Sequence, residues 1–251
     1  MGEVMSGSII VLVTGLLVGL AFGFVLQRGR YCMNTAFRDI IFINDFTIFR
    51  AYLLALIVAI LGANFLEDVG IIEGGLRRQA FAPIANIVGG YIFGLGIVLA
   101  GGCGSGVLYR VGEGLMAAWV ALLGFAIGII SAMHGFLNPV FTFLKSFRVE
   151  IGGVINPSLW DIFGGGTSAK WLTIIVVVMI MGIVVLKGKP FAKGPAKAYS
   201  WSLAGLLVGI IAVIAWWASA FWGGNARGLS FTGPTADFFM AVLTRDSKAP
   251  G

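Results

Sequence analysis

The sequence predicts an all-α, polytopic membrane protein, and three observations lead to this fold class. Apolar residues (Ala, Val, Ile, Leu, Met, Phe, Trp, Tyr and Cys) make up 59% of the 251-residue chain. Charged residues make up only 11%, against about 25% in an average soluble domain. The apolar residues also gather in long runs separated by short polar stretches. So little charge cannot cover a soluble surface, which excludes a soluble enzyme, a disordered chain and a nucleic-acid binder.

Six apolar runs are long enough to cross a bilayer, whose hydrocarbon core of about 30 Å requires about 20 residues of helix. The expected spans, each with at most one charged residue, are Ser8–Gln27, Phe46–Leu66, Pro83–Ala100, Gly114–Met133, Trp171–Leu186 and Ser200–Trp222. The stretch Phe136–Phe147 is too short to span and contains an Asn-Pro pair. We expect it to lie at the interface or to re-enter the membrane.

The Lys and Arg residues of the loops predict the orientation of the spans, because cytoplasmic loops are rich in these residues. The loop Lys187–Lys197 after the fifth span has four lysines and no acid, so we expect it to be cytoplasmic. Counting back, the loop with Arg28, Arg30 and Arg38 is also cytoplasmic, and the N-terminus lies outside. The acidic residues that we expect to be solvated in an outer loop are Glu67, Asp68 and Glu73.

A short internal repeat predicts that the chain is built from two related parts. Gly15–Gly19 and Gly205–Gly209 share the sequence Gly-Leu-Leu-Val-Gly, and an Arg-Gly pair and a Thr-Ala pair follow each copy. The alternative is chance recurrence in helices rich in Gly and Leu. The two copies run in opposite directions in the expected topology, as in many transporters. We therefore expect one transmembrane domain over 1–251, with a first repeat over 8–197 and an incomplete, inverted second repeat starting over 200–251.

The two cysteines lie in short segments that interrupt apolar runs. Residues 28–39 read Arg-Gly-Arg-Tyr-Cys-Met-Asn-Thr-Ala-Phe-Arg-Asp and contain Cys32. Residues 100–110 read Ala-Gly-Gly-Cys-Gly-Ser-Gly-Val-Leu-Tyr-Arg and contain Cys103. Non-helical backbone at membrane depth is tolerated where it is buried in protein or lines a cavity. Two such breaks, each with a thiol, therefore indicate a pathway.

Both segments have features of a helix break that binds an anion. Glycines let the backbone bend and approach a ligand closely. A helix that restarts at Ser105 would direct amide N–H groups at Cys103, and we expect Asn34 or Thr35 to cap a half-helix behind Cys32. A thiol is a weak, polarisable donor that suits a large, soft anion. The expected pathway residues are Cys32, Asn34, Thr35, Gly102, Cys103, Gly104, Ser105 and Gly106, and the residues expected to attract the anion are Arg30, Arg38 and Arg110.

These two cysteine segments resemble the motifs of the YeeE/YedE sulfur-transport family. The resemblance covers about residues 8–130, and residues 227–243 more loosely. It implies an inner-membrane protein with inverted halves and re-entrant helices, in a family with thiosulfate importers and relatives linked to selenium metabolism. It also implies that Cys32 and Cys103 line the path and handle the anion by transient S–H···S contacts, without covalent chemistry. The thiosulfate carriers have a further pathway Cys in their second half, so a chain with two Cys resembles a shortened or split form.

The leading functional prediction is a non-enzymatic importer of a small sulfur-containing anion, with thiosulfate as the favoured cargo. No cofactor is expected, and two Cys and one His are too few ligands for a metal carrier. The expected partners are the lipid bilayer and either a second transporter half or a cytoplasmic sulfur-carrier protein. The alternatives are a membrane subunit of a two-chain sulfur or selenium transporter and a membrane thiol-redox protein.

Each candidate residue also has a structural interpretation. The two cysteines are small enough to serve as buried apolar filler. Arg38 and Asp39 lie in an otherwise apolar stretch, so a structural ion pair with neighbouring residues or with Arg50 is the alternative to a role in binding.

Overall fold

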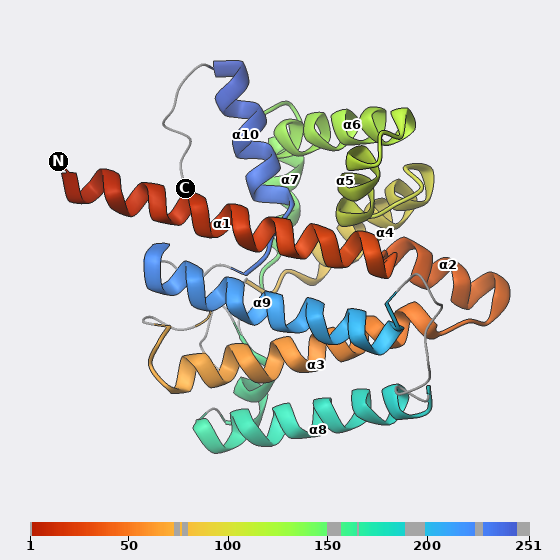
Figure 1. Ribbon diagram of the computed structural model, residues 1–251, viewed down its shortest axis with the longest axis vertical. Coiled ribbons are helices and arrows are strands. Elements are labelled where there is room, and N and C mark those ends of the chain that lie inside the picture. Colours follow the sequence, from red (N-terminus) through yellow and green to blue (C-terminus); the bar gives the residue numbers. More distant parts are fainter. Residues whose placement is uncertain are drawn as a thin grey trace. The chain divides into compact units, whose positions relative to one another are not determined.

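The computed structural model describes residues 2–72, 76, 80–149, 157–164, 166–188, 199–223 and 228–244. These residues form ten α-helices and one short 3-10 helix, and no strand occurs among them (Figure 1). The elements are α1 (Gly2–Gly29), α2 (Met33–Ile43), α3 (Thr47–Asp68), α4 (Pro83–Leu99), α5 (Gly104–Gly112), α6 (Met116–Met133), α7 (Asn138–Ser146), η1 (Leu159–Phe163), α8 (Thr167–Leu186), α9 (Trp201–Gly223) and α10 (Thr232–Thr244). The predicted all-α class is confirmed.

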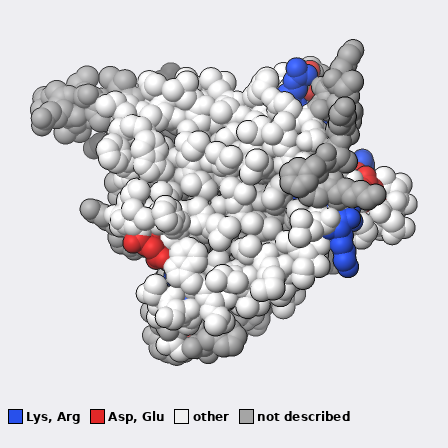
Figure 2. Space-filling model, turned by 60° about the horizontal axis from the view of Figure 1, so that its bottom comes forward, with Lys and Arg blue, Asp and Glu red and all other residues white. Residues whose placement is uncertain are grey.

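Six helical segments are long and apolar enough to cross a membrane, which confirms the number of spans predicted from the sequence. Two of them, Ile10–Ile43 and Pro83–Gly112, each join a long helix to the short helix that follows its cysteine. The surface in Figure 2 is almost entirely white, and the few charged side chains lie near its margins. The chain is therefore a multi-pass membrane protein.

The helices divide into two compact units. Unit 1 combines residues 1–78 with 163–229 and contains α1, α2, α3, α8 and α9. Unit 2 combines residues 79–162 with 230–251 and contains α4, α5, α6, α7 and α10. Each unit is thus built from two separate stretches of chain. The single transmembrane domain and the repeat boundaries remain predictions.

Unit 1 is a layer of helices in which α9 lies between α1 and α3, and α3 lies between α9 and α8 (Figure 1). Gly205 and Gly209 make the close approach of α9 to α3 possible, because a Cβ at Gly205 would meet the carbonyl oxygen of Ala51. A Cβ at Gly209 would lie only 2.6 Å from the Cβ of Val58. Small residues at helix interfaces allow this kind of tight packing in membranes.

The contacts of unit 1 also give the relative directions of its helices. Along α9, Gly205 contacts Ala51 and Gly209 contacts Val58, so α3 and α9 run parallel. Gly29, the last residue of α1, lies against Ala204 near the start of α9, so these two helices run antiparallel. Both relations agree with the alternating crossings expected from the sequence.

The two copies of the repeated pentamer have different surroundings. The second copy packs tightly through Gly205 and Gly209, as described above. At Gly15 and Gly19 of the first copy, an added Cβ would meet nothing within 4 Å. The same five residues therefore form a helix interface on α9 and an open face on α1.

A partly buried ion cluster joins the end of α3 to the start of α8. The Nζ of Lys170 donates to Glu67 Oε2 and to Asp68 Oδ1, at 2.7 Å in both cases. The Nε1 of Trp171 donates to Asp68 Oδ2 at 2.6 Å, and the Lys170 side chain is only 8% exposed. Glu67 and Asp68 are therefore ion-paired residues at the end of α3 and not members of a solvated loop, although Asp68 remains exposed. Glu73 lies outside the described residues.

The start of the fifth span explains why the ion cluster was missed. The expected span began at Trp171, whereas α8 begins at Thr167 and includes Lys170. The expected span therefore leaves out Lys170, which lies near the start of α8. Placing it in the first turn of α8 brings it opposite the acidic end of α3.

Unit 2 is assembled around α6, which contacts α5, α7 and α10. The short helix α7 lies within the predicted stretch Phe136–Phe147 and also contacts α4. The amide of Val149 donates to the carbonyl of Phe81 at 2.9 Å, which joins the segment after α7 to the residues before α4. The placement of α7 at the membrane interface remains a prediction.

We expect the Lys170→Met substitution to destabilise unit 1, because it leaves two acidic side chains without their shared cation. Removing one partner of a fully buried ion pair costs about 3–5 kcal/mol, and the partial exposure of Asp68 lowers the cost here to between that range and the value of about 0–1 kcal/mol for a surface pair. Each kcal/mol lowers the unfolding midpoint of a chain of this size by about 2–4 °C. Circular dichroism in detergent measures the midpoint. Lys145→Met, at an exposed lysine of α7, is the matched control. Equal midpoints for the two variants would contradict a stabilising role for the cluster.

The repeated pentamer provides a second, internally matched test. Gly209→Val inserts a branched side chain where even a Cβ has no room, and we expect a lower unfolding midpoint. Gly19→Val places the same side chain at the equivalent position of the open copy, where we expect little change. A similar loss of stability in both variants, measured by thermal unfolding in detergent, would show that the two faces do not differ in packing.

Candidate functional site

The first helix break begins where α1 ends. Arg30 has a left-handed backbone (φ 48°), a conformation that non-glycine residues seldom adopt. Its amide donates to the carbonyl of Gln27 at 3.3 Å, and the amide of Tyr31 donates to the carbonyl of Leu26 at 3.0 Å. This pair of hydrogen bonds is the Schellman arrangement, which pairs the last carbonyls of a helix with the residues that leave it. The chain can therefore turn without leaving these carbonyls unpaired.

Cys32 opens the next helix. Its backbone is extended (φ −144°, ψ 128°), it occupies the N-cap position of α2, and its carbonyl accepts the amide of Ala36 at 3.0 Å. The predicted cap at Asn34 or Thr35 is wrong, because both residues already lie inside the first turn of α2. The Cys32 side chain makes no capping hydrogen bond.

The second break, at Cys103, has the same backbone plan. Gly101 is left-handed (φ 66°) two residues before the cysteine, just as Arg30 is two residues before Cys32. Cys103 is extended (φ −74°, ψ 175°) and occupies the N-cap position of α5, where its carbonyl accepts the amide of Val107 at 2.8 Å. The helix restarts at Gly104, one residue earlier than expected.

The thiol of Cys103 lies beside a hydroxyl group. Its Sγ is 3.3 Å from the Oγ of Ser105, and either atom can donate. Cys103 is 8% exposed and Cys32 is fully buried, and neither is in a disulfide. The amides of Gly104, Ser105 and Gly106 belong to the first turn of α5. They precede the first hydrogen bond of the helix, in which the amide of Val107 donates to the carbonyl of Cys103. The Ser105 hydroxyl thus lies next to the thiol, whereas the Cys103 side chain makes no capping hydrogen bond to these amides.

Glycines on both sides of Cys103 allow close packing at this break. A Cβ at Gly102 would lie 3.4 Å from the carbonyl carbon of Gly106 and from the nitrogen of Val107. A Cβ at Gly104 would lie 3.7 Å from Phe125 Cζ and from Phe231 Cβ. The two aromatic residues were not anticipated from the sequence, because they come from α6 and from the residue before α10.

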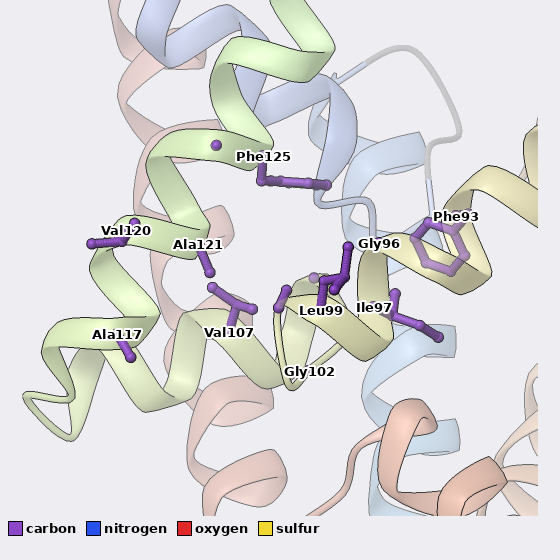
Figure 3. Close-up of a pocket in the computed structure, with 13 residues that line it drawn as sticks. Phe93, Gly96, Ile97, Leu99, Gly102, Val107, Ala117, Val120, Ala121 and Phe125 are labelled. Carbon is purple, nitrogen blue, oxygen red and sulfur yellow. The ribbon is translucent and has the colours of Figure 1, made fainter.

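An apolar crevice of about 520 Å³ lies next to this break (Figure 3). Its walls come from α4 and α6, and Val107 of α5 also lines it. Gly102 and Gly104, the two neighbours of Cys103, both border the crevice. In Figure 3, Leu99, Val107 and Ala121 point into the same space. The cysteine segment of unit 2 is therefore adjacent to a space large enough for a small ligand.

The three arginines predicted to attract an anion have different surroundings. Arg38 pairs with the neighbouring Asp39, whose Oδ1 accepts its Nε at 2.9 Å and its Nη2 at 2.8 Å. This contact matches the structural alternative of an ion pair, although Asp39 itself is the partner. Arg110 donates from Nη1 to the carbonyl of Gly101, and Arg30 is exposed. Among the described residues, no cluster of three His, Cys, Asp or Glu side chains could hold a metal ion.

Comparison with known proteins identifies the family. The family model for sulphur transport matches residues 28–250, which include both cysteine segments. The chain belongs to the sulphur transport family.

Relatives with assigned names agree with this membership. The chain is 32% identical to the thiosulfate transporter TsuA of Spirochaeta thermophila over 238 residues, which is 92% of this chain and 70% of that protein. It is also 32% identical to the thiosulfate transporter TsuA of Escherichia coli K12, over 94% of this chain and 69% of that protein. The probable transporter YedE of Escherichia coli K12 is 33% identical over 113 residues, or 45% of this chain.

Membership of the sulphur transport family points to a transporter and not to an enzyme, since the similar proteins are named as transporters. The predicted family resemblance is confirmed. The roles of the individual predicted site residues remain proposals. Sequence reasoning located both cysteines and their glycines but not the left-handed residue that precedes each cysteine.

The tight packing at Gly102 provides a test of the break geometry in this sulphur transport family member. Gly102→Val would force its branched side chain into the first turn of α5, and we expect faster hydrogen–deuterium exchange of the α5 amides. Gly102→Ala, with its Cβ at 3.4 Å, should change exchange little. Gly112→Val is the control, because a Cβ at Gly112 meets nothing within 4 Å. Unchanged exchange in Gly102→Val would show that α5 does not depend on this contact.

Proposed function

We propose that this chain imports a small sulfur-containing anion, with thiosulfate as the favoured cargo. The observation that carries the proposal is the shared plan of the two breaks, in which a cysteine follows a left-handed residue and opens a half-helix. Relatives that are named thiosulfate transporters support the choice of cargo.

The arrangement at Cys103 suits a soft anion for three reasons. The first-turn amides of α5 and the positive end of its dipole favour negative charge. The hydroxyl of Ser105, 3.3 Å from the thiol sulfur, is a second donor within reach of the same ligand. The thiol is a weak and polarisable donor, so it would hold a terminal sulfur atom without binding it too tightly to release. Each contact is transient, and no bond to the anion is made or broken.

Cys32 would serve as the second pathway thiol. Cys32 is completely buried, so the proposed path would be closed at this position. Passage of an anion therefore requires a local opening around the start of α2. Alternation between closed and open states at a narrow point is how carriers prevent free leakage of solutes.

The arginines supply positive potential along the proposed path. Arg110 lies in the last turn of α5, and Cys103 is the N-cap residue of the same helix. Arg30 and Arg38 flank Cys32 in the sequence, although Asp39 offsets part of the charge of Arg38. We propose that these side chains raise the local concentration of anions, an effect that falls with ionic strength.

The proposed membrane is the inner membrane, with the N-terminus outside and the loop Lys187–Lys197 in the cytoplasm. The concentration of lysines in that loop supports this orientation. Residues 189–198 of the loop lie outside the described residues. The helix directions within unit 1 agree with the proposed alternation of crossings.

A two-chain transporter, for sulfur or selenium, is the second candidate. The open glycines of α1, Gly15 and Gly19, support it, because the same pentamer on α9 packs against another helix. A second transporter half or a cytoplasmic sulfur-carrier protein would be the partner. A thiol-redox protein has less support, because each thiol lies at a helix break with no His or carboxylate beside it in the sequence.

Growth on thiosulfate as sole sulfur source tests the proposal. The host lacks its own sulfate and thiosulfate importers, and it expresses the wild type, Cys103→Ala or Cys32→Ala. We expect growth with the wild type and loss of growth with either alanine variant, because each removes a donor from the path. Cys103→Ser keeps a donor, so partial growth is expected.

The other outcomes of the growth test are also decisive. Absence of growth with the wild type, at normal expression, would reject self-sufficient thiosulfate import and favour a missing partner or another cargo. Growth that survives both alanine substitutions would reduce the cysteines to apolar filler.

A further inference from the structure

The side chain of Arg110 reaches back along its own helix to the break that precedes it. Arg110 lies in the last turn of α5, yet its Nη1 donates to the carbonyl of Gly101, before Cys103. The contact therefore links the end of the half-helix to the turn that begins it. It spans nine residues of sequence.

The position of Gly101 explains why this hydrogen bond matters. Gly101 follows the end of α4, where the last carbonyls of a helix have no partner within it. Gly101 lies within the candidate membrane span Pro83–Gly112, and inside a bilayer an unpaired carbonyl is costly, because no water is available to replace the missing donor. A guanidinium donor is charged and so forms a stronger hydrogen bond than a neutral one.

The glycines of the break leave room for the guanidinium group. A Cβ at Gly102 would lie 3.5 Å from Arg110 Nη1, and a Cβ at Gly101 would lie 3.7 Å from it. The guanidinium thus lies over the Gly101–Gly102 turn, next to Cys103.

We infer that Arg110 is a positioning residue for the Cys103 site. By holding the carbonyl of Gly101, it fixes the turn from which Cys103 and the first turn of α5 project. The inference deepens the proposed function and rests on it for its effect on transport. It differs from the attraction of anions by charge, because it requires a hydrogen bond and not only a positive group nearby.

The first experiment measures the reactivity of the Cys103 thiol towards a small neutral reagent, iodoacetamide, in the purified full chain. Peptide mass spectrometry follows Cys103 and Cys32 separately, so Cys32 is an internal reference. We expect Arg110→Gln to speed alkylation of Cys103 by about tenfold, which corresponds to the loss of one charge-assisted hydrogen bond. A neutral reagent is not itself attracted by the guanidinium. Because loss of the Arg110 charge disfavours the reactive thiolate, a faster rate in Arg110→Gln reports a looser turn and not the lost charge.

Arg148→Gln is the matched control. Arg148 also donates to a backbone carbonyl, from Nε to that of Lys145 at 3.1 Å, but away from the break. We expect it to leave the alkylation of Cys103 unchanged. An unchanged Cys103 rate in Arg110→Gln would overturn the inference, as would an equal rise in Arg148→Gln or at Cys32.

Arg110→Lys keeps the protein testable if the glutamine variant does not fold. It retains the charge but not the planar fork of donors. For a positioning role we expect faster Cys103 alkylation and a lower maximal rate of thiosulfate uptake at a nearly unchanged KM. Wild-type alkylation and uptake in Arg110→Lys would assign Arg110 to charge attraction alone. The alkylation result does not depend on thiosulfate transport. Failure of the proposed function can therefore be distinguished from failure of the positioning role of Arg110.

Discussion

A helix that stops inside an apolar region must find partners for its last carbonyls, and this requirement shapes both cysteine segments. At the end of α1, Arg30 takes a left-handed backbone and the amides of Arg30 and Tyr31 close the helix. At the end of α4, Gly101 takes the same backbone region, the amides of Ala100 and Gly101 pair with the last carbonyls, and Arg110 pairs with the carbonyl of Gly101 beyond the helix. Only because these ends are satisfied can the chain place an extended cysteine and start a new helix beside it.

Two kinds of contact hold the helices of unit 1 together. Glycines bring the backbones of α3 and α9 together, so shape and not hydrophobic attraction decides which faces pair in the membrane. At the end of α3, one lysine joins two carboxylates, and the geometry is specific because Trp171 also donates to Asp68. Glycine packing thus positions α9 along the length of α3, and the ion cluster fixes the end of α3 to the start of α8.

The sequence contained enough information to predict the fold class, the spans and both helix breaks, because these follow from long apolar runs and from glycines around cysteines. It did not identify the caps, because Asn34 and Thr35 are good capping residues by type, whereas the backbone path made Cys32 the cap. Nor did the sequence reveal the partners of Lys170. A lysine in a loop and a buried lysine cannot be distinguished by sequence alone until the position of α3 is known. Contacts between distant segments, such as Phe231 with Gly104, leave no local signal.

The ion cluster of unit 1 has a consequence for how the chain is made. Lys170 is 102 residues later in the chain than Asp68, so the ribosome releases the carboxylates well before their cation. Helices α4 to α7 are synthesised in the interval. Glu67 and Asp68 must therefore remain hydrated at the membrane surface, or be shielded by the insertion machinery, until α8 arrives. Unit 1 is therefore completed only after most of unit 2 has been synthesised.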